Sequence, residues 1–410
     1  MTDADRAFNP FDADQVQHAW PLLAELRKRS AVASIEGGMH YVTRHAECRA
    51  VLRDVASFSN ASGFKQPGVE VPLEDRVLGE LDPPLHTSVR RVMVTALTPR
   101  VVHAAEPFIR ETSDALLAGL PVPGRADLVP SFTAPLPTRV TAHLLGFPPA
   151  DADRLAGWAK ELMESGFPAT NRSERGEGFE RAFPEFAGYI DEQIEDRARA
   201  AASSGDDGDS DVLTRLLALD VGDGSRLTRR QVRALTRNLI TGGFTTTSQL
   251  IGNLLDALLR HAELERALRD SPGALGTAIE ESLRLSPPVL FVPRGCMQDV
   301  DVAETTVHAG ERVIAGTASA NRDDRVFDDP DTFRIDRENP EQHLTFGYGP
   351  HVCPGAALAR IEARIAITAF LDRFPSGTVR LEPGYEFVNV PTFFECGPRE
   401  LPVELGPASG

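Results

Sequence analysis

The sequence lacks the features that would place the protein in or across a membrane. Its 410 residues contain no uninterrupted apolar run of about 18 residues, roughly the length that a helix needs to span a bilayer. Residues 1–6 are acidic and polar, without the basic start and apolar centre of a secretory signal. We therefore expect a cytoplasmic protein with no membrane partner.

Cysteine is scarce and widely spaced. The four cysteines, Cys48, Cys296, Cys353 and Cys396, form no CxxC pair, which suits a reducing compartment better than a disulfide scaffold. The sequence shows neither an iron–sulfur cysteine pattern nor a flavin-binding pattern. The formal net charge of −17 argues against nucleic acid as a partner, because the phosphate backbone attracts basic proteins.

Apolar residues are plentiful, at 41% of the chain, which is enough to bury a sizeable core. Length alone leaves one large domain, or two or three smaller ones, open. Helical periodicity favours helices over much of 105–220, and a long helix from the Thr228-x-x-Gln231 capping box to about residue 260. Alternating patterns predict a small hairpin within 31–43 and an extended strand at 289–294.

One cysteine stands in a stretch rich in glycine and proline. Cys353 lies within residues 345–355 and is followed at once by a helical run, residues 356–363. Glycine and proline fix the shape of a loop and let a large flat group approach the backbone. The N–H groups and dipole of the following helix favour a thiolate, so the loop is suited to bind a metal. A buried free cysteine is the alternative for this residue taken alone.

Three other patterns place polar side chains at helical spacing. His86 and Arg90 lie four residues apart near the start of a predicted helix, where they could clamp a carboxylate or form a solvated basic face. Glu281 and Arg284 are within reach of each other, or form an ordinary surface pair. Residues 241–248 of the long helix are rich in glycine and hydroxyl groups, which predicts a local opening; a helix-packing notch is the alternative.

These motifs together resemble the cytochrome P450 family. Phe346, Gly349, His351, Cys353 and Gly355 fill its haem-ligand pattern, Phe-x-x-Gly-x-His-x-Cys-x-Gly. The other patterns follow in the family's order, so the resemblance covers essentially the whole chain. It implies a soluble bacterial-type member with a single domain over residues 1–410, mainly α with small β-sheets. In that fold, a triangular helical prism, haem b lies between the long central helix and the cysteine loop.

The resemblance also assigns the haem contacts. Cys353 would be the thiolate ligand of the iron, and dioxygen would be the co-substrate. Charged groups would neutralise the two propionates, and Phe346 would pack beside the thiolate. The full set of cofactor contacts implied is His86, Arg90, Leu97, Gly242, Arg294, Thr345, Phe346, Gly347, His351, Pro354, Gly355 and Ala359.

The oxygen-binding segment departs from the family pattern at one position. Its catalytic residues would be Gly243, Thr245 and Thr246, with Thr246 bonded to the bound oxygen. Thr245 stands where the family usually carries a carboxylate, so proton relay through an acid at that position is in doubt. The two hydroxyls, with ordered water, could pass protons instead. The run of three threonines leaves the register open by one residue.

Two further sets of residues follow from the resemblance. Glu281, Arg284 and Arg337 would form a buried structural trio that shapes the core and does no redox chemistry. The substrate would be apolar or aromatic, because the expected pocket residues are themselves aromatic or aliphatic. These are Phe64, Phe167, Phe244, Val289, Leu290, Phe291 and Phe393.

The activity implied is insertion of oxygen into an organic molecule. A thiolate opposite dioxygen favours O–O cleavage, so we expect a monooxygenase that hydroxylates or O-demethylates a small-to-medium substrate. Electrons would come from a ferredoxin and its reductase, docking near Cys353 where Arg91, Arg100 and Arg360 could form a basic patch. Because Thr245 replaces the acid that the family usually carries, peroxide-driven or oxidative-coupling chemistry is the alternative. A non-catalytic haem sensor or carrier would need an interaction surface or a signalling domain, and the sequence shows neither.

Overall fold

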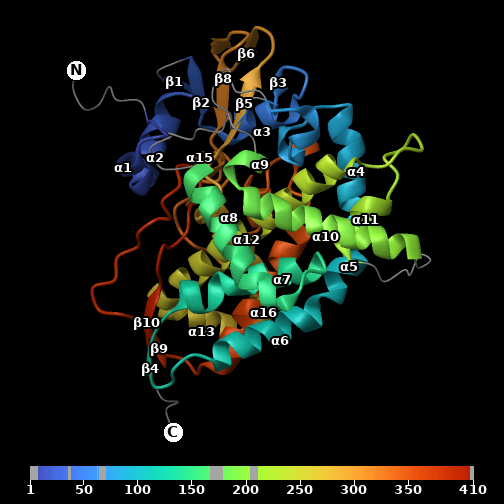
Figure 1. Cartoon of the computed structure of the whole chain (residues 1–410). Coiled ribbons are helices and arrows are strands. Elements are labelled where there is room, and N and C mark those ends of the chain that lie inside the picture. Colours follow the sequence, from blue (N-terminus) through green and yellow to red (C-terminus); the bar gives the residue numbers. More distant parts are fainter. Residues whose placement is uncertain are drawn as a thin grey trace.

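The computed structural model describes residues 8–35, 38–61, 63, 71–166, 179–203 and 211–406. Helices dominate these ranges, and small sheets lie at two separate edges of the molecule (Figure 1). The prediction of a mainly α chain with small β-sheets is confirmed.

The helices carry most of the core. The main apolar cluster is built from residues on many of them and includes the buried side of the longest helix, α12. The helices are α1 Ala13–Gln17, α2 Ala19–Arg29, α3 His45–Arg53, α4 Leu85–Ala96, α5 Pro99–Ala104, α6 Glu106–Ala118, α7 Pro135–Leu144, α8 Ala152–Gly166, α9 Phe179–Ala182, α10 Pro184–Ser203, α11 Val212–Ala218, α12 Arg229–Arg260, α13 Ala262–Asp270, α14 Leu275–Leu285, α15 Thr317–Ala320 and α16 Ala356–Arg373.

The strands form a five-stranded sheet in the order β1-β2-β8-β5-β3, a three-stranded sheet in the order β4-β10-β9, and the hairpin β6-β7. The β2–β8 pair is parallel and the other pairs are antiparallel. The strands are β1 Val32–Ile35, β2 Met39–Val42, β3 Phe58–Ser59, β4 Gly124–Asp127, β5 Val292–Cys296, β6 Val300–Val302, β7 Thr305–Val307, β8 Arg312–Ala315, β9 Val379–Leu381 and β10 Pro402–Leu405.

Helix α12 runs through the middle of the molecule and packs against α7, α8, α10, α14 and α16 (Figure 1). It begins as predicted, because the Thr228 hydroxyl accepts from the N–H of Gln231 and the Gln231 side chain accepts from the N–H of Thr228. Helix α16 contacts α12 and starts three residues after Cys353. The central helix and the cysteine loop are therefore neighbours.

The expected opening in the middle of α12 is wrong, because the helix is continuous from Arg229 to Arg260. Its hydroxyl residues do not break the backbone ladder; they bond back to carbonyls one turn earlier. Thr241 donates to the carbonyl of Arg237 at 3.0 Å, and Thr246 donates to that of Gly242 at 2.7 Å. Within the described ranges, no helix has the length and apolarity needed to cross a bilayer.

Candidate active site

The loop that carries Cys353 is shaped by its glycines. Gly349 has a φ of +75°, in the left-handed region, and a Cβ added there would lie 3.0 Å from the Cα of Arg53 in α3. Only glycine fits this close approach without strain. The turn then closes when the Cys353 N–H donates to the Phe346 carbonyl at 2.8 Å. The sequence motif thus encodes a tight loop wedged against α3.

The sulfur of Cys353 faces the start of α16. Cys353 keeps accessible surface, and burial raises the pKa of its thiol. The N–H groups of Gly355 and Ala356 and the charges of Arg90 and Arg360 act in the opposite direction. A metal cation on the sulfur would stabilise the thiolate further.

Basic side chains from three distant segments converge beside this loop. The rings of His86, from α4, and His351, from the cysteine loop, lie 3.8 Å apart between centroids. Burial is the largest cause that lowers the pKa of His86 to about 4 and that of His351 to about 3. The charge of Arg90 contributes to both shifts, and the charges of His86 and Arg294 contribute to the shift of His351. Burial also lowers the pKa of Arg294, in β5, to about 10. The buried cluster therefore brings two imidazoles, which are neutral near pH 7, together with the guanidinium cations of Arg90 and Arg294.

The charge of Asp82 opposes the lowering of the pKa of His86 and Arg294, but the Asp82 carboxylate accepts from Ser59 and Asn60, and no hydrogen bond joins it to the cluster in the described structure. Among the described residues, nothing bonds to either ring nitrogen of His86, to Nε2 of His351 or to Nε of Arg294, although all four atoms are buried. Orphaned donors of this kind indicate a missing acceptor. Paired carboxylates, such as the two propionates of haem, would supply both the charge and the acceptors. The residues therefore fit the cofactor that the sequence implies.

The other expected haem contacts surround this region. Leu97 ends α4, Thr345–Gly347 and Pro354–Gly355 lie in the cysteine loop, and Ala359 lies in the first turn of α16. All of them keep partial exposure, as the residues beside a bound group should when the protein atoms are considered alone. Their roles as haem contacts stay predictions.

The oxygen-binding segment lies in the central turns of α12. Gly242 is exposed although it lies in the middle of the helix, and Thr246 is partly exposed. Gly243 packs against Thr141 of α7, whose Oγ1 would lie 2.6 Å from an added Cβ. Thr245 points elsewhere: its Oγ1 donates to a carboxylate oxygen of Glu395 at 2.9 Å.

Sequence reasoning missed Glu395. It comes from the C-terminal loop, 150 residues from Thr245 in the chain, and its side chain is buried. The available signal was the apolar run around it, Phe393-Phe394-Glu395-Cys396, because an acid in such a run is expected to need a partner. The identity of that partner required the fold.

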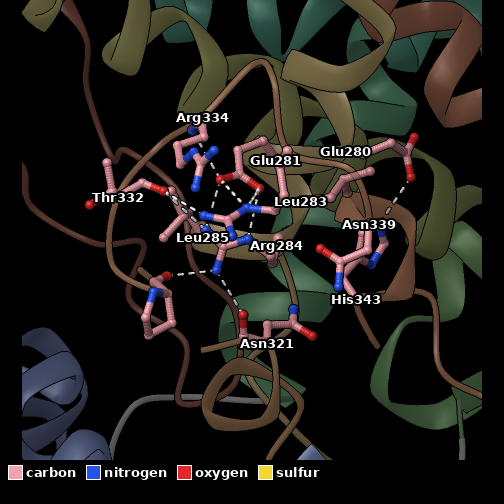
Figure 2. A network of polar contacts seen from close by, with 12 residues as sticks. Glu280, Glu281, Leu283, Arg284, Leu285, Asn321, Thr332, Arg334, Asn339 and His343 are labelled. Atoms are coloured by element: carbon pink, nitrogen blue, oxygen red, sulfur yellow. Dashed lines mark hydrogen bonds and ion pairs between the residues drawn. The ribbon is translucent and has the colours of Figure 1, made fainter. Parts of the chain in front are cut away.

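The structure brings the predicted trio together, and Figure 2 shows two of its members, Glu281 and Arg284, facing each other. Arg284 donates to both oxygens of Glu281, at 2.7 and 2.8 Å, and Arg337 does so from the other side, at 2.9 and 3.0 Å. The two guanidinium groups also donate to carbonyls of residues 328–332. Glu281 and Arg284 have no exposed surface, so the trio is a buried ion cluster and not a surface pair.

The trio is linked to the cysteine loop. Arg284 donates to the carbonyl of Asn321 at 2.9 Å. The Asn321 side chain in turn accepts from the N–H of Leu344 at 2.6 Å and donates to the Thr345 hydroxyl at 2.9 Å. Thr345 donates to the Leu283 carbonyl at 2.6 Å. This chain of contacts fixes the entrance of the loop that presents Cys353.

The predicted pocket residues divide into groups. Phe244 is buried on α12, and Val289 is partly exposed. Leu290, Phe291 and Phe393 belong to a core cluster in which the Phe291 ring contacts Phe393, Tyr41 and Phe11. Two further candidates, Phe64 and Phe167, lie outside the described residues. The whole set stays a prediction.

Comparison with known proteins agrees with this site. The family model described as Cytochrome P450 matches residues 167–271 and 274–384. The vitamin D(3) 25-hydroxylase of Pseudonocardia autotrophica is 32% identical over 406 residues, covering 96% of this chain and 95% of the relative. The erythromycin C-12 hydroxylase of Saccharopolyspora erythraea is 32% identical over 386 residues, with 94% of each chain covered.

The fold has solved counterparts. The structure of cytochrome P450 CYP109Q5 from Chondromyces apiculatus superposes with a TM-score of 0.84 at 31% identity, with 98% of each chain covered. The expected fold class is thereby confirmed. The chain belongs to the cytochrome P450 family of monooxygenases, which bind haem through a cysteine thiolate and use dioxygen as co-substrate.

Proposed function

We propose that Cys353 is the haem ligand of a monooxygenase that inserts one oxygen atom into an apolar or aromatic organic molecule, by hydroxylation or O-demethylation. The observation that carries the proposal is the buried cluster of His86, His351 and Arg294 beside the cysteine loop, whose ring and guanidinium nitrogens have no partner among the described residues. When bound, haem b supplies the oxidising chemistry through its thiolate ligand.

The protein's own part is to bind, orient and exclude water. Arg90, Arg294, His86 and His351 would hold the propionates by charge-assisted hydrogen bonds. The Cys353 sulfur receives N–H groups from the first turn of α16, which favour its anionic form. Phe346 would keep water from the sulfur. The Cζ atom of the Arg360 guanidinium lies over the Phe346 ring, 4.5 Å from its centroid.

On the opposite side, Thr246 would hold the oxygen. Its hydroxyl donates to the Gly242 carbonyl, a contact it can exchange for an oxygen acceptor. The neighbouring Gly243 lets α7 pack closely against this turn of α12. Together these residues would place a hydroxyl, and not a bulky side chain, next to the reacting atoms.

Electrons would reach the site from a separate ferredoxin-type donor. A surface hollow of about 330 Å³ lies over the cysteine loop and is lined by Arg49, His343, Phe346, Val352 and Arg360, among others. Arg360 is paired with Glu280 at 2.6 Å, so it offers less free charge than the sequence suggested. Arg91 and Arg100 are exposed and remain candidates for the donor's acidic surface.

The substrate is proposed only by class. Relatives of similar identity act on compounds as different as vitamin D(3) and erythromycin, so their names select no single molecule. The proposed pocket residues are apolar, and this favours an apolar or aromatic ligand over a charged one. Peroxide-driven or oxidative-coupling chemistry has no support from these relatives, which are both named hydroxylases.

Two experiments test the proposal. The reduced protein, mixed with carbon monoxide, should show the red-shifted Soret band of a thiolate ligand, and Cys353→Ser should abolish it. A panel of apolar and charged compounds should then be scored by the shift of the Soret band on binding. Turnover should require ferredoxin, its reductase, NAD(P)H and dioxygen. Turnover supported by hydrogen peroxide alone would contradict the proposal, and so would a panel bound only by charged compounds.

A further inference from the structure

One carboxyl group near the oxygen-binding segment has no role in the assignment above. Glu395 is 1% exposed. One of its oxygens accepts from Thr245 Oγ1 at 2.9 Å, and the other lies 3.2 Å from Thr392 Oγ1. Gln249 of α12 donates to it as well. In the part of the chain that the structure describes, no arginine, lysine or histidine forms an ion pair with this group.

The position of Glu395 is fixed from both sides. Thr245, Gln249 and Asn253 follow one another at intervals of four, so they share one face of α12, and all three contact the C-terminal loop. Asn253 donates to the Cys396 carbonyl at 3.0 Å. A Cβ on Gly397 would lie 2.5 Å from the Gln249 side chain, so glycine is needed for this close packing.

The other side of the loop pairs with the segment that follows α14. Leu290 N–H donates to the Phe394 carbonyl at 2.7 Å, and Cys396 N–H donates to the Pro288 carbonyl at 3.0 Å. These two bonds bracket Glu395, which forms an isolated bridge with Val289. The carboxyl is therefore held against Thr245 by backbone contacts that do not depend on its own charge.

We propose that Glu395 supplies, through the Thr245 hydroxyl, the carboxyl group that the oxygen-binding segment of α12 lacks. The inference rests on the proposed function, and it assigns Glu395 as a positioning and proton-delivering residue that acts through another side chain. The acid usually carried at position 245 would here come from the C-terminal loop and approach the same turn of the helix from outside.

The protonation state of Glu395 sets the direction of the Thr245 hydroxyl. When the carboxyl is ionised, it accepts the Thr245 proton and turns that proton away from Thr246. When it is protonated, it can donate to Thr245 Oγ1, which frees the hydroxyl proton of Thr245 from the carboxylate. The other acceptor of that hydroxyl in the structure is the Thr241 carbonyl at 3.4 Å, and in turnover ordered water leading to the reacting oxygen would take its place. The carboxylate that results regains its proton from water. Each monooxygenase turnover consumes dioxygen, two electrons from the donor and two protons, so such deliveries are part of the balance.

The environment suits this exchange. Burial raises the pKa of Glu395 to about 7, while hydrogen bonds from Thr245, Gln249 and Thr392 oppose the rise. None of the charged groups of the described elements packed around it shifts this pKa. The next residue in the chain, Cys396, is also titratable, but burial raises the pKa of its thiol to about 12, so that thiol stays neutral. A group with a pKa near the operating pH can both accept and release a proton.

A purely structural role makes different predictions. If Glu395 only holds the C-terminal loop against α12, its hydrogen bonds are all that is needed. The amide of Glu395→Gln has the same shape and keeps an acceptor for the Thr245 hydroxyl. Proton delivery needs the acid. Glu395→Gln should therefore lower kcat for an alkoxycoumarin, an apolar aromatic probe, about 10- to 100-fold with little change in KM, and raise the peroxide released per NAD(P)H. Thr245→Asp in the Glu395→Gln background should restore part of the loss, because it returns an acid to α12.

A readout without turnover completes the test. In an infrared titration, wild-type protein should show a protonated carboxyl band that disappears with a midpoint near the pKa of about 7, and Glu395→Gln should lack this band. Glu400→Gln, the same change at an exposed site of the same loop, should leave band and activity unchanged. If Glu395→Gln does not fold, Thr245→Val, which removes the intervening hydroxyl, should show the same kcat and peroxide effects.

Unchanged kcat, peroxide release and pH profile in Glu395→Gln, or a titrating band that survives in it, would overturn the inference. Wild-type behaviour of Thr245→Val would do so as well. The proposed function would remain standing in those cases if the wild type shows the thiolate band and ferredoxin-dependent turnover. Failure of the wild type in those two assays would remove the proposed function instead.

Discussion

The buried carboxyl group of Glu395 should make the stability of this protein depend on pH. Burial raises its pKa in the folded state from an ordinary 4.5 to about 7. Below the lower value the group is protonated in both states and makes no difference. As pH rises from 4.5 to about 7, the unfolded chain loses the proton while the folded protein keeps it, so the free energy of unfolding falls. Above about 7 the loss is complete.

The size of the effect follows from the two pKa values. At about 1.4 kcal/mol per pKa unit, the gap between 4.5 and about 7 corresponds to about 3 kcal/mol. Most of this, about 2–3 kcal/mol, should be lost between about pH 5 and about pH 8. Glu395→Gln cannot ionise, so it should lack this part of the pH dependence. Relative to the wild type, the variant should gain stability as the pH rises.

The measurement is urea unfolding of the haem-loaded wild type and of haem-loaded Glu395→Gln, each at about pH 5 and at about pH 8. Taking the difference between the two proteins cancels the titration of every other group. Glu400→Gln is the matched control, because its side chain is exposed and its difference from the wild type should not change with pH. If the gap between Glu395→Gln and the wild type is the same at both pH values, the carboxyl is not held neutral by burial, and the reasoning is refuted.

Three other changes should act through the haem contacts, the trio and the loop. Arg294→Leu should weaken haem retention about 10- to 100-fold, since a charge-assisted hydrogen bond contributes about 1.5–3 kcal/mol. The rate of haem transfer to apomyoglobin measures this retention. An unchanged rate would show that Arg294 does not bind a propionate. Arg337→Met should lower the free energy of unfolding by about 3–5 kcal/mol, because it leaves Glu281 half paired, whereas Arg337→Lys should cost less. Gly349→Ala should cost at least about 1–2 kcal/mol from its positive φ and reduce haem content; full stability in urea would show that the loop can relax.

The sequence was sufficient to predict those elements that are fixed by contacts between residues close together in the chain. The capping box at Thr228 and Gln231 marks the start of α12, because both partners lie within one turn. The spacing of Glu281 and Arg284 places them on one helix face, whereas the resemblance alone supplied Arg337. Strand β4, Gly124–Asp127, has no alternating pattern and exists because β10 pairs with it, so the helix-rich interpretation of that region missed it.

Long-range contacts explain what the sequence could not supply. The contact between the rings of His86 and His351 joins α4 to the cysteine loop, and neither segment alone indicates the other. Helix propensities also failed to predict that α12 continues through residues 241–248. Propensities count the cost of glycine and threonine but not the packing of Gly243 against α7, which tertiary structure supplies.

Position 245 shows why a missing motif residue is weak evidence for a missing chemical group. A motif records which side chain usually supplies an atom, whereas the reaction requires only that the atom be present at the right place. Thr245 carries no carboxyl group, but its hydroxyl donates to the carboxylate of Glu395 at 2.9 Å. If that carboxyl delivers protons, the absence of an acid at position 245 no longer favours peroxide-driven chemistry. Restoration of activity by Thr245→Asp in the Glu395→Gln background would then establish that the acid can come from either element.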